Sequence, residues 1–148
     1  MLGQHQLGAS TIVSRGSLTA PTTDTVKAAL YLASATINAA TTVYTVTGEV
    51  SGTNYTAGGV TVTNATAPTS TNSSATAGVG YWTPSASIVY TNVTLATSFD
   101  TVLMYNSTQS NKAISVHTFT AQTITAGTLT LTMPSNTTTT ALLRLATT

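Results

Sequence analysis

The sequence predicts an all-β fold: a single β-sandwich or jelly-roll-like domain of about eight short strands, with an extended N-terminal arm. Three observations lead to this prediction. Apolar and polar residues alternate with a period of two in several segments. Roughly a quarter of the residues are threonine, whose β-branched side chain favours strands. Clusters of Gly, Pro, Asn and Ser separate the segments at the spacing typical of sandwiches.

The first 24 residues show little periodicity, and we expect them to form an extended arm with at most a short strand at residues 10–13. Pro21 marks the end of this arm, and the β-sandwich domain occupies residues 25–148. We expect the arm to dock on a partner subunit through its scattered apolar residues, chiefly Leu2, Leu7, Ile12 and Val13.

Eight segments carry the strand pattern: residues 25–32, 41–50, 58–63, 87–95, 101–106, 112–119, 127–133 and 140–145. The alternation slips near Asn92, as a β-bulge would cause. The continuously apolar segment 101–106 predicts a central strand that is covered on both faces. Residues 33–40 suit a single turn, and the low-complexity segment 64–80 predicts a long loop that is free to wrap a neighbour.

Alternation also predicts which side chains share a face. Val26, Ala28, Leu30 and Leu32 should face one way, as should Tyr44, Val46 and Val50 in the second segment. Further inward-facing sets are Ile114 with Val116, Leu129 with Leu131 and Met133, and Leu143 with Leu145.

Charge is scarce in this chain. Of its 148 residues only 5% are charged, against about 25% in an ordinary soluble domain, and the formal net charge is +1. No basic patch indicates nucleic acid, no apolar run is long enough for a membrane helix, and no basic and apolar leader indicates secretion. We therefore expect neither nucleic acid nor membrane as a partner. A nearly neutral surface favours self-association.

The sequence predicts no enzyme, cofactor site or metal site. The three acids, Asp24, Glu49 and Asp100, lie in different segments, so we expect no catalytic pair of carboxylates. His117 falls within an expected strand, and no Gly-x-Ser-x-Gly motif accompanies it. The two histidines and three acids show no metal-ligand spacing.

The segment "GEVSGTNYTAGG", residues 48–59, is the richest in glycine. It lacks the Lys of a phosphate loop, and a strand rather than a helix follows it. The glycines and Asn54 are better explained as turn residues. We expect Tyr55 to pack onto the end of the sandwich, and Glu49 to accept backbone N–H bonds or to pair with a cation.

Trp82 has two interpretations. An exposed Trp82 would stack on a sugar or contact a partner subunit, and a buried one would anchor a loop or fill the core. The second interpretation is favoured because a tryptophan more often fills a core or anchors a loop, and Trp82 is kept among the candidate partner contacts.

Four quoted segments together resemble small virion structural proteins of tailed bacteriophages: "VKAALYL", "TVYTVTGEVSGTNYTAGG", "DTVLMYNSTQSNKAISV" and "TLTLTMPSNTTTTALLRL". The resemblance covers roughly residues 25–145. It implies a β-rich subunit of the phage head or neck, such as a capsid decoration (cement) protein. That role would make the major capsid protein or other virion subunits its partners, and would place it in the virion after synthesis in the host cytoplasm. A homo-oligomer, for example a trimer, is expected. The segment 64–80 and the low charge depart from the pattern.

A second class of function stays open. A tail-fibre or surface adhesin built on a β-sandwich would bind a host receptor or carbohydrate. Such a protein needs exposed aromatic side chains along a groove, and this sequence offers Trp82 and a few tyrosines for that purpose.

Overall fold

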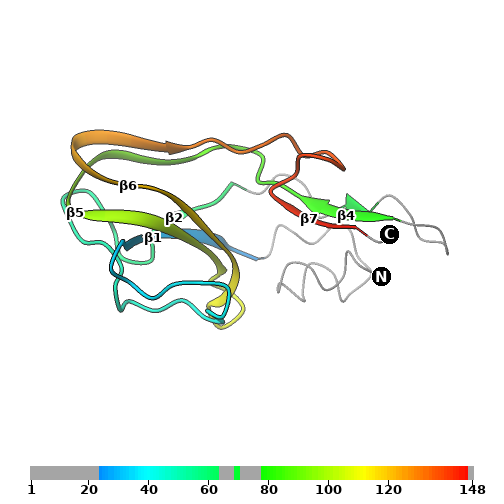
Figure 1. Ribbon diagram of the computed structural model, residues 1–148, viewed down its shortest axis with the longest axis horizontal. Coiled ribbons are helices and arrows are strands. Elements are labelled where there is room, and N and C mark those ends of the chain that lie inside the picture. Colours follow the sequence, from blue (N-terminus) through cyan, green and yellow to red (C-terminus); the bar gives the residue numbers. More distant parts are fainter. Residues whose placement is uncertain (1–23, 64–68, 71–77, 147–148) are drawn as a thin grey trace.

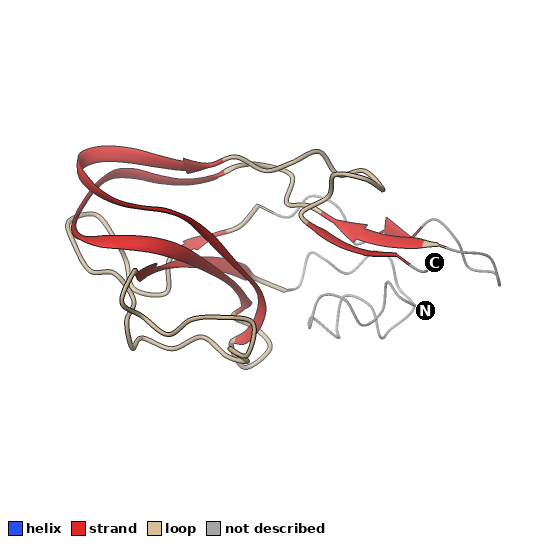
Figure 2. Ribbon diagram, viewed as in Figure 1, coloured by secondary structure: helices blue, strands red, loops and turns tan. Residues whose placement is uncertain are grey.

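A computed structural model describes residues 24–63, 69–70 and 78–146, and within these residues every regular element is a strand (Figures 1 and 2). The all-β prediction is confirmed. The strands are β1 (Val26–Leu32), β2 (Val60–Thr61), β3 (Thr69–Ser70), β4 (Val79–Trp82), β5 (Ile88–Asn106), β6 (Lys112–Leu131) and β7 (Leu143–Ala146).

The strands differ from the expected eight short ones. Two expected pairs are each merged into one long strand, so that β5 has 19 residues and β6 has 20. Together these strands form one long antiparallel hairpin, closed by a tight turn in which Ser110 and Asn111 have positive φ. A strand continues through polar residues when the adjacent strand forms backbone hydrogen bonds with them. The alternation of apolar and polar residues therefore did not show that the expected segments join.

The long hairpin bends over on itself to make two layers (Figure 1). Its pairing shifts register repeatedly between Tyr90 and Thr101, and Asn92 and Ala126 have positive φ there. The bulge expected near Asn92 is therefore confirmed. Each extra residue increases local twist, and several in succession turn the ribbon sharply. The first half of β5 pairs with the second half of β6 in one layer, and the remaining halves lie in the other.

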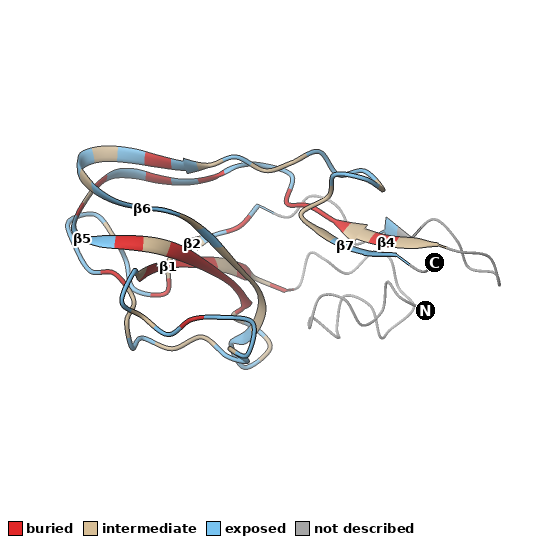
Figure 3. Cartoon of the chain, in the orientation of Figure 1, coloured by how far each residue is buried: buried red, intermediate tan, exposed pale blue. Residues whose placement is uncertain are grey.

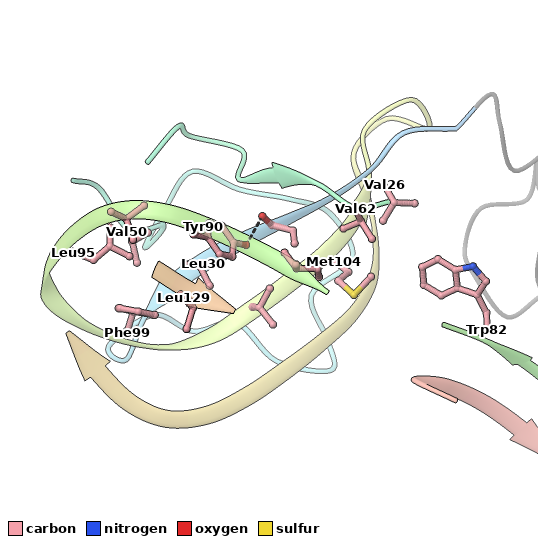
Figure 4. Packing of buried hydrophobic residues seen from close by; sticks show 14 residues of the cluster. Val26, Leu30, Val50, Val62, Trp82, Tyr90, Leu95, Phe99, Met104 and Leu129 are labelled. Carbon is pink, nitrogen blue, oxygen red and sulfur yellow. Dashed lines mark hydrogen bonds between the residues drawn. The ribbon is translucent and has the colours of Figure 1, made fainter. Parts of the chain in front are cut away.

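The second layer is completed by β1 and β2, in the strand order β2-β1-β5-β6, all antiparallel. The main core fills the space between the layers and contains the face of β1 that alternation predicted (Figure 4). The phenol of Tyr90, in the first layer, crosses the core and donates a hydrogen bond to the carbonyl of Ala28, at 2.8 Å. A three-stranded sheet, β3-β4-β7, stands at one end.

A smaller core lies on the opposite face of β1 and β5. It contains Ala29, Tyr31, Leu103 and Tyr105, and Ile37 covers them from the loop that follows β1. The segment 101–106 is thus buried on both faces, as its continuous apolar run predicted (Figure 3). By contrast the outer strand β6 is largely exposed or half-buried.

Several predictions from alternation are confirmed: Leu129 is buried, and Leu131 and Met133 pack against the main core while the intervening threonines are exposed. The prediction that Ile114 and Val116 share a face was wrong. Ile114 packs against the main core and Val116 against the smaller one. The register shift between Met104 and Tyr105 inserts one extra residue into β6 and reverses the faces after it.

Three further expectations need correction. Residues 41–50 form no continuous strand, because the chain turns at Gly48, which has a φ of +79°, and Val46 is 69% exposed. Leu145 is 45% exposed, although Leu143 does pack on the core. The described parts of segment 64–80 include β3 and the start of β4, so that segment is not a single loop.

The proposed arm lies outside the described residues except for Asp24. That residue is buried and hydrogen-bonded to Asn106, so it belongs to the folded domain rather than to the arm.

Candidate functional site

Within the described residues, polar side chains that could carry a function lie at four places: the loop around Glu49, the network around Asp24, the pair Ser115 and His117, and a groove beside β6. The candidate contacts Leu2, Leu7, Ile12 and Val13 lie outside the described residues.

Trp82 is 1% exposed, so the structure favours the core-anchoring interpretation and leaves this ring no exposed face for a sugar or a partner. Figure 4 shows its indole at the end of the main core nearest β4, on the side of Val26 and Val62.

The loop of residues 48–59 is organised by the carboxylate of Glu49. Its Oε1 accepts hydrogen bonds from the Tyr55 hydroxyl and the Gly58 backbone N–H, both at 2.7 Å. Its Oε2 accepts one from the Tyr44 hydroxyl at 2.6 Å. The expectation that Glu49 would accept a backbone N–H is confirmed, and so is the packing of Tyr55 against the main core. The two tyrosine donors were not foreseen.

The tyrosines around this carboxylate form a wider cluster. Tyr44 stacks on Tyr105 with ring centroids 4.6 Å apart, and Tyr55 stacks on Tyr90 at 6.0 Å. The Tyr105 hydroxyl donates to the carbonyl of Gly58, and the Tyr55 hydroxyl also accepts the N–H of Leu30. We call Glu49 and these four tyrosines the Glu49 cluster.

The rest of the loop is fixed by backbone contacts. Val50 N–H donates to the carbonyl of Leu30 on β1, and Thr94 N–H on β5 donates to the carbonyl of Thr53. Gly59 has a φ of +70°, and a Cβ there would lie 1.7 Å from the carbonyl oxygen of Ala28. The loop therefore joins β1 to the bend of β5. Its glycines serve turns, as the sequence predicted, and its described residues form no phosphate-binding loop.

A second polar network surrounds Asp24. Its carboxylate accepts hydrogen bonds from the side chains of Asn106, Thr108 and Gln109, at 3.1–3.2 Å. Asn106 is fully buried, and Thr25 N–H donates to the Thr108 hydroxyl. These bonds attach the start of β1 to the turn between β5 and β6. Their donors are neutral side chains of one turn, which is the pattern of a structural anchor.

The structure brings Ser115 Oγ within 3.0 Å of His117 Nε2 on β6. No nucleophile motif in the sequence indicated this pair, although residues two apart on a strand share a face. Burial lowers the pKa of His117 and so favours its neutral form. Within the described residues, this is the one hydrogen bond that the ring makes, so no carboxylate there orients the imidazole as a catalytic triad requires.

A groove of about 780 Å³ runs between the loop of residues 37–43 and residues 112–118 of β6. Ile37, Val43 and Val116 supply apolar lining, Ser115 and Thr118 supply hydroxyls, and Lys112 is the charged residue on its wall. Nothing in the sequence pattern pointed to this groove, because its two walls come together only through the fold.

Nowhere in the described parts of the chain do three or more His, Cys, Asp or Glu residues gather as metal ligands would. The same parts contain no helix of the length and apolar character needed to span a membrane. Comparison of the chain with family models, with curated proteins and with solved structures finds no match.

The Glu49 cluster and the adjacent Tyr31 predict a sharp loss of stability in alkali. Burial raises the pKa of Tyr31 to about 12, and burial with the nearby Glu49 carboxylate raises the pKa of Tyr44, Tyr55, Tyr90 and Tyr105. The unfolded value is about 10, so the stabilisation is complete below pH 10 and is lost as the pH rises toward and beyond 12.

Phenolate absorbance and far-UV circular dichroism, followed together during an alkaline titration, measure this. We expect the phenolate signal of these five tyrosines to rise together with the loss of strand signal. Tyrosine ionisation that is complete near pH 10 with the fold intact would contradict the assignment of buried, protonated hydroxyls.

Proposed function

We propose that this chain is a structural virion protein, specifically a capsid decoration (cement) protein that binds and stabilises a phage head. The observation that carries the proposal is that the few acidic side chains accept hydrogen bonds within the domain. Asp24 and Glu49 are occupied by internal hydrogen bonds, and Asp100 accepts one from the neighbouring Thr101 hydroxyl. The outer surface of the described domain exposes few charges, among them Lys112 and Arg144, and is rich in threonine and other neutral side chains.

Such a surface associates without ion pairs. Copies with little charge do not repel one another, and contacts made through area and backbone hydrogen bonds are insensitive to salt. A standard interface buries about 1,600 Å², and repetition over a symmetric shell multiplies modest contacts into stable attachment. On a capsid, subunits that bridge neighbouring capsomers would oppose the pressure of packaged DNA. The partners in this proposal are the major capsid protein and further copies of this chain, for example as a trimer.

The adhesin alternative finds less support. A sugar-binding face needs exposed aromatic rings. Trp82 is buried, and hydroxyls of the tyrosines in the Glu49 cluster donate hydrogen bonds within the domain. A distribution confined to a few copies at the tail tip would favour the adhesin over the decoration protein.

The proposal predicts that the protein copurifies with particles in many copies and stays attached in high salt. Particles are washed in molar salt, and the retained protein is quantified by mass spectrometry together with particle survival on heating. We expect retention to be unchanged by salt and heat survival to fall when the protein is omitted. Absence from particles, or release by salt alone, would overturn the proposal.

The proposal also predicts no acyl-transfer chemistry at Ser115. A fluorophosphonate probe, which labels activated serines, should leave the purified protein unlabelled, because no third group in the described part of the chain orients His117. The matched variants are Ser115→Ala and His117→Ala. Labelling of the native chain that both substitutions abolish, with the fold preserved by circular dichroism, would show an active dyad and contradict a purely structural role.

A further inference from the structure

Among the described residues, the outer edge of β6 is open to a further strand. In the sheet order β2-β1-β5-β6, β6 pairs with β5 on one side. On its other side residues 42–44 begin an antiparallel pairing: Ala113 N–H donates to the Thr42 carbonyl, and Tyr44 N–H to the Asn111 carbonyl, both at 2.9 Å. Past Ala113, no outward backbone hydrogen bond joins β6 to another segment of the described chain.

The pairing stops where the groove begins. Residues 38–41 form a turn and make no backbone hydrogen bond to β6. The groove lies beside them and is lined by Ile37, Val43, Ser115, Val116 and Thr118. Residues 115–118 pair with β5 in unbroken register, so this stretch of the edge is regular strand about four residues long. A strand added here would continue the pairing that residues 42–44 start.

This edge lacks the usual protection. Exposed edge strands are commonly guarded by charges, proline or bulges that discourage pairing with another chain. β6 contains no proline, and Lys112 at its first residue is its one charged side chain. Bulges interrupt the strand on either side of residues 115–118, but that stretch has none. An incoming segment should therefore be short, uncharged and β-favouring.

The residues that precede the domain supply such a segment. Residues 10–13 are Ser, Thr, Ile and Val, which are uncharged, and three of the four are β-branched. The chain enters the domain at Asp24, which the turn residues Asn106, Thr108 and Gln109 hold beside the start of β6. The ten residues 14–23 can span up to about 33 Å, enough to reach an adjoining copy.

We propose that the groove beside β6 accepts residues 10–13 of a second copy of this chain as an added antiparallel strand. Every copy has one groove and one such segment, so in any closed ring, a two-fold dimer or a trimer, each copy gives one strand and receives one. The inference rests on the proposed function only in that a virion subunit acts as an assembly of copies.

The chain has no cysteine, so engineered cysteines report on this contact without background. One full-length preparation carries Thr118→Cys, in the groove. A second carries a single donor cysteine, in four versions: Ser10→Cys, Thr11→Cys, Ile12→Cys and Val13→Cys. Equal amounts are mixed and oxidised mildly, and mixed dimers are counted by non-reducing electrophoresis and mass spectrometry. The matched control acceptor is Val46→Cys, which is exposed and does not line the groove.

We expect mixed dimers with Thr118→Cys to exceed those with Val46→Cys by about tenfold or more, because a disulfide needs Cα atoms held within about 7 Å. Alternate donor positions should link and the others should not, since successive side chains of a strand point to opposite faces. Val43→Cys, on the other wall of the groove, is a second acceptor in case Thr118→Cys impairs folding.

Three outcomes would overturn the proposal. Equal linking of groove and control acceptors would mean random encounter. Dominant links between two Thr118→Cys chains would mean that β6 edges pair with each other. A chain carrying both Thr118→Cys and a donor cysteine that links only within itself would place the segment in its own groove. Because the experiment uses purified protein without particles, its failure is separate from failure of the decoration role.

Discussion

The hydrogen bonds to the Glu49 carboxylate are the interaction on which the arrangement of this domain depends. They hold the loop of residues 48–59 over β1, where Gly59 passes too close to the Ala28 carbonyl for any side chain. The same loop reaches the bend of β5 at Thr94. One layer of the sandwich is a two-stranded ribbon, which is marginally stable by itself. The loop and the Tyr90 hydrogen bond to Ala28 fasten that ribbon to the layer beneath.

Local patterns predicted the elements of the fold better than their assembly. Period-two alternation identified β1, the buried face of Leu129 and the bulge at Asn92, because each is a property of one strand. It did not show that β5 and β6 are single long strands, since that depends on bulges which repair the register across polar residues. The Glu49 cluster escaped prediction because it joins distant segments. The pair Ser115 and His117 escaped prediction because the sequence around Ser115 carries no nucleophile motif.

The internal use of polar groups and the neutral exterior are related, because acids that accept internal hydrogen bonds add little charge to the surface. Two of the three acids, Glu49 and Asp24, anchor Tyr44, Tyr55 and the turn at Asn106, and most of the aromatic rings lie in the interior. What is left outside is a threonine-rich surface and the open edge of β6. A surface of this kind gives little selectivity for a small ligand and offers area and backbone hydrogen bonds to protein partners. This physical reasoning links the fold to the proposed role in an assembly.

The free energy of unfolding of Glu49→Gln, measured by urea denaturation at neutral pH, tests the central claim most directly. The substitution keeps the size of the side chain but replaces one acceptor oxygen by a donor that faces a hydroxyl or the Gly58 N–H. We expect a loss of about 3 kcal/mol or more, since hydrogen bonds to a charged group contribute about 1.5–3 kcal/mol each. Asp100→Asn, the matched change at a carboxylate bonded to its neighbour Thr101, should cost less than about 1 kcal/mol. Equal stabilities of Glu49→Gln and the native chain would contradict the account.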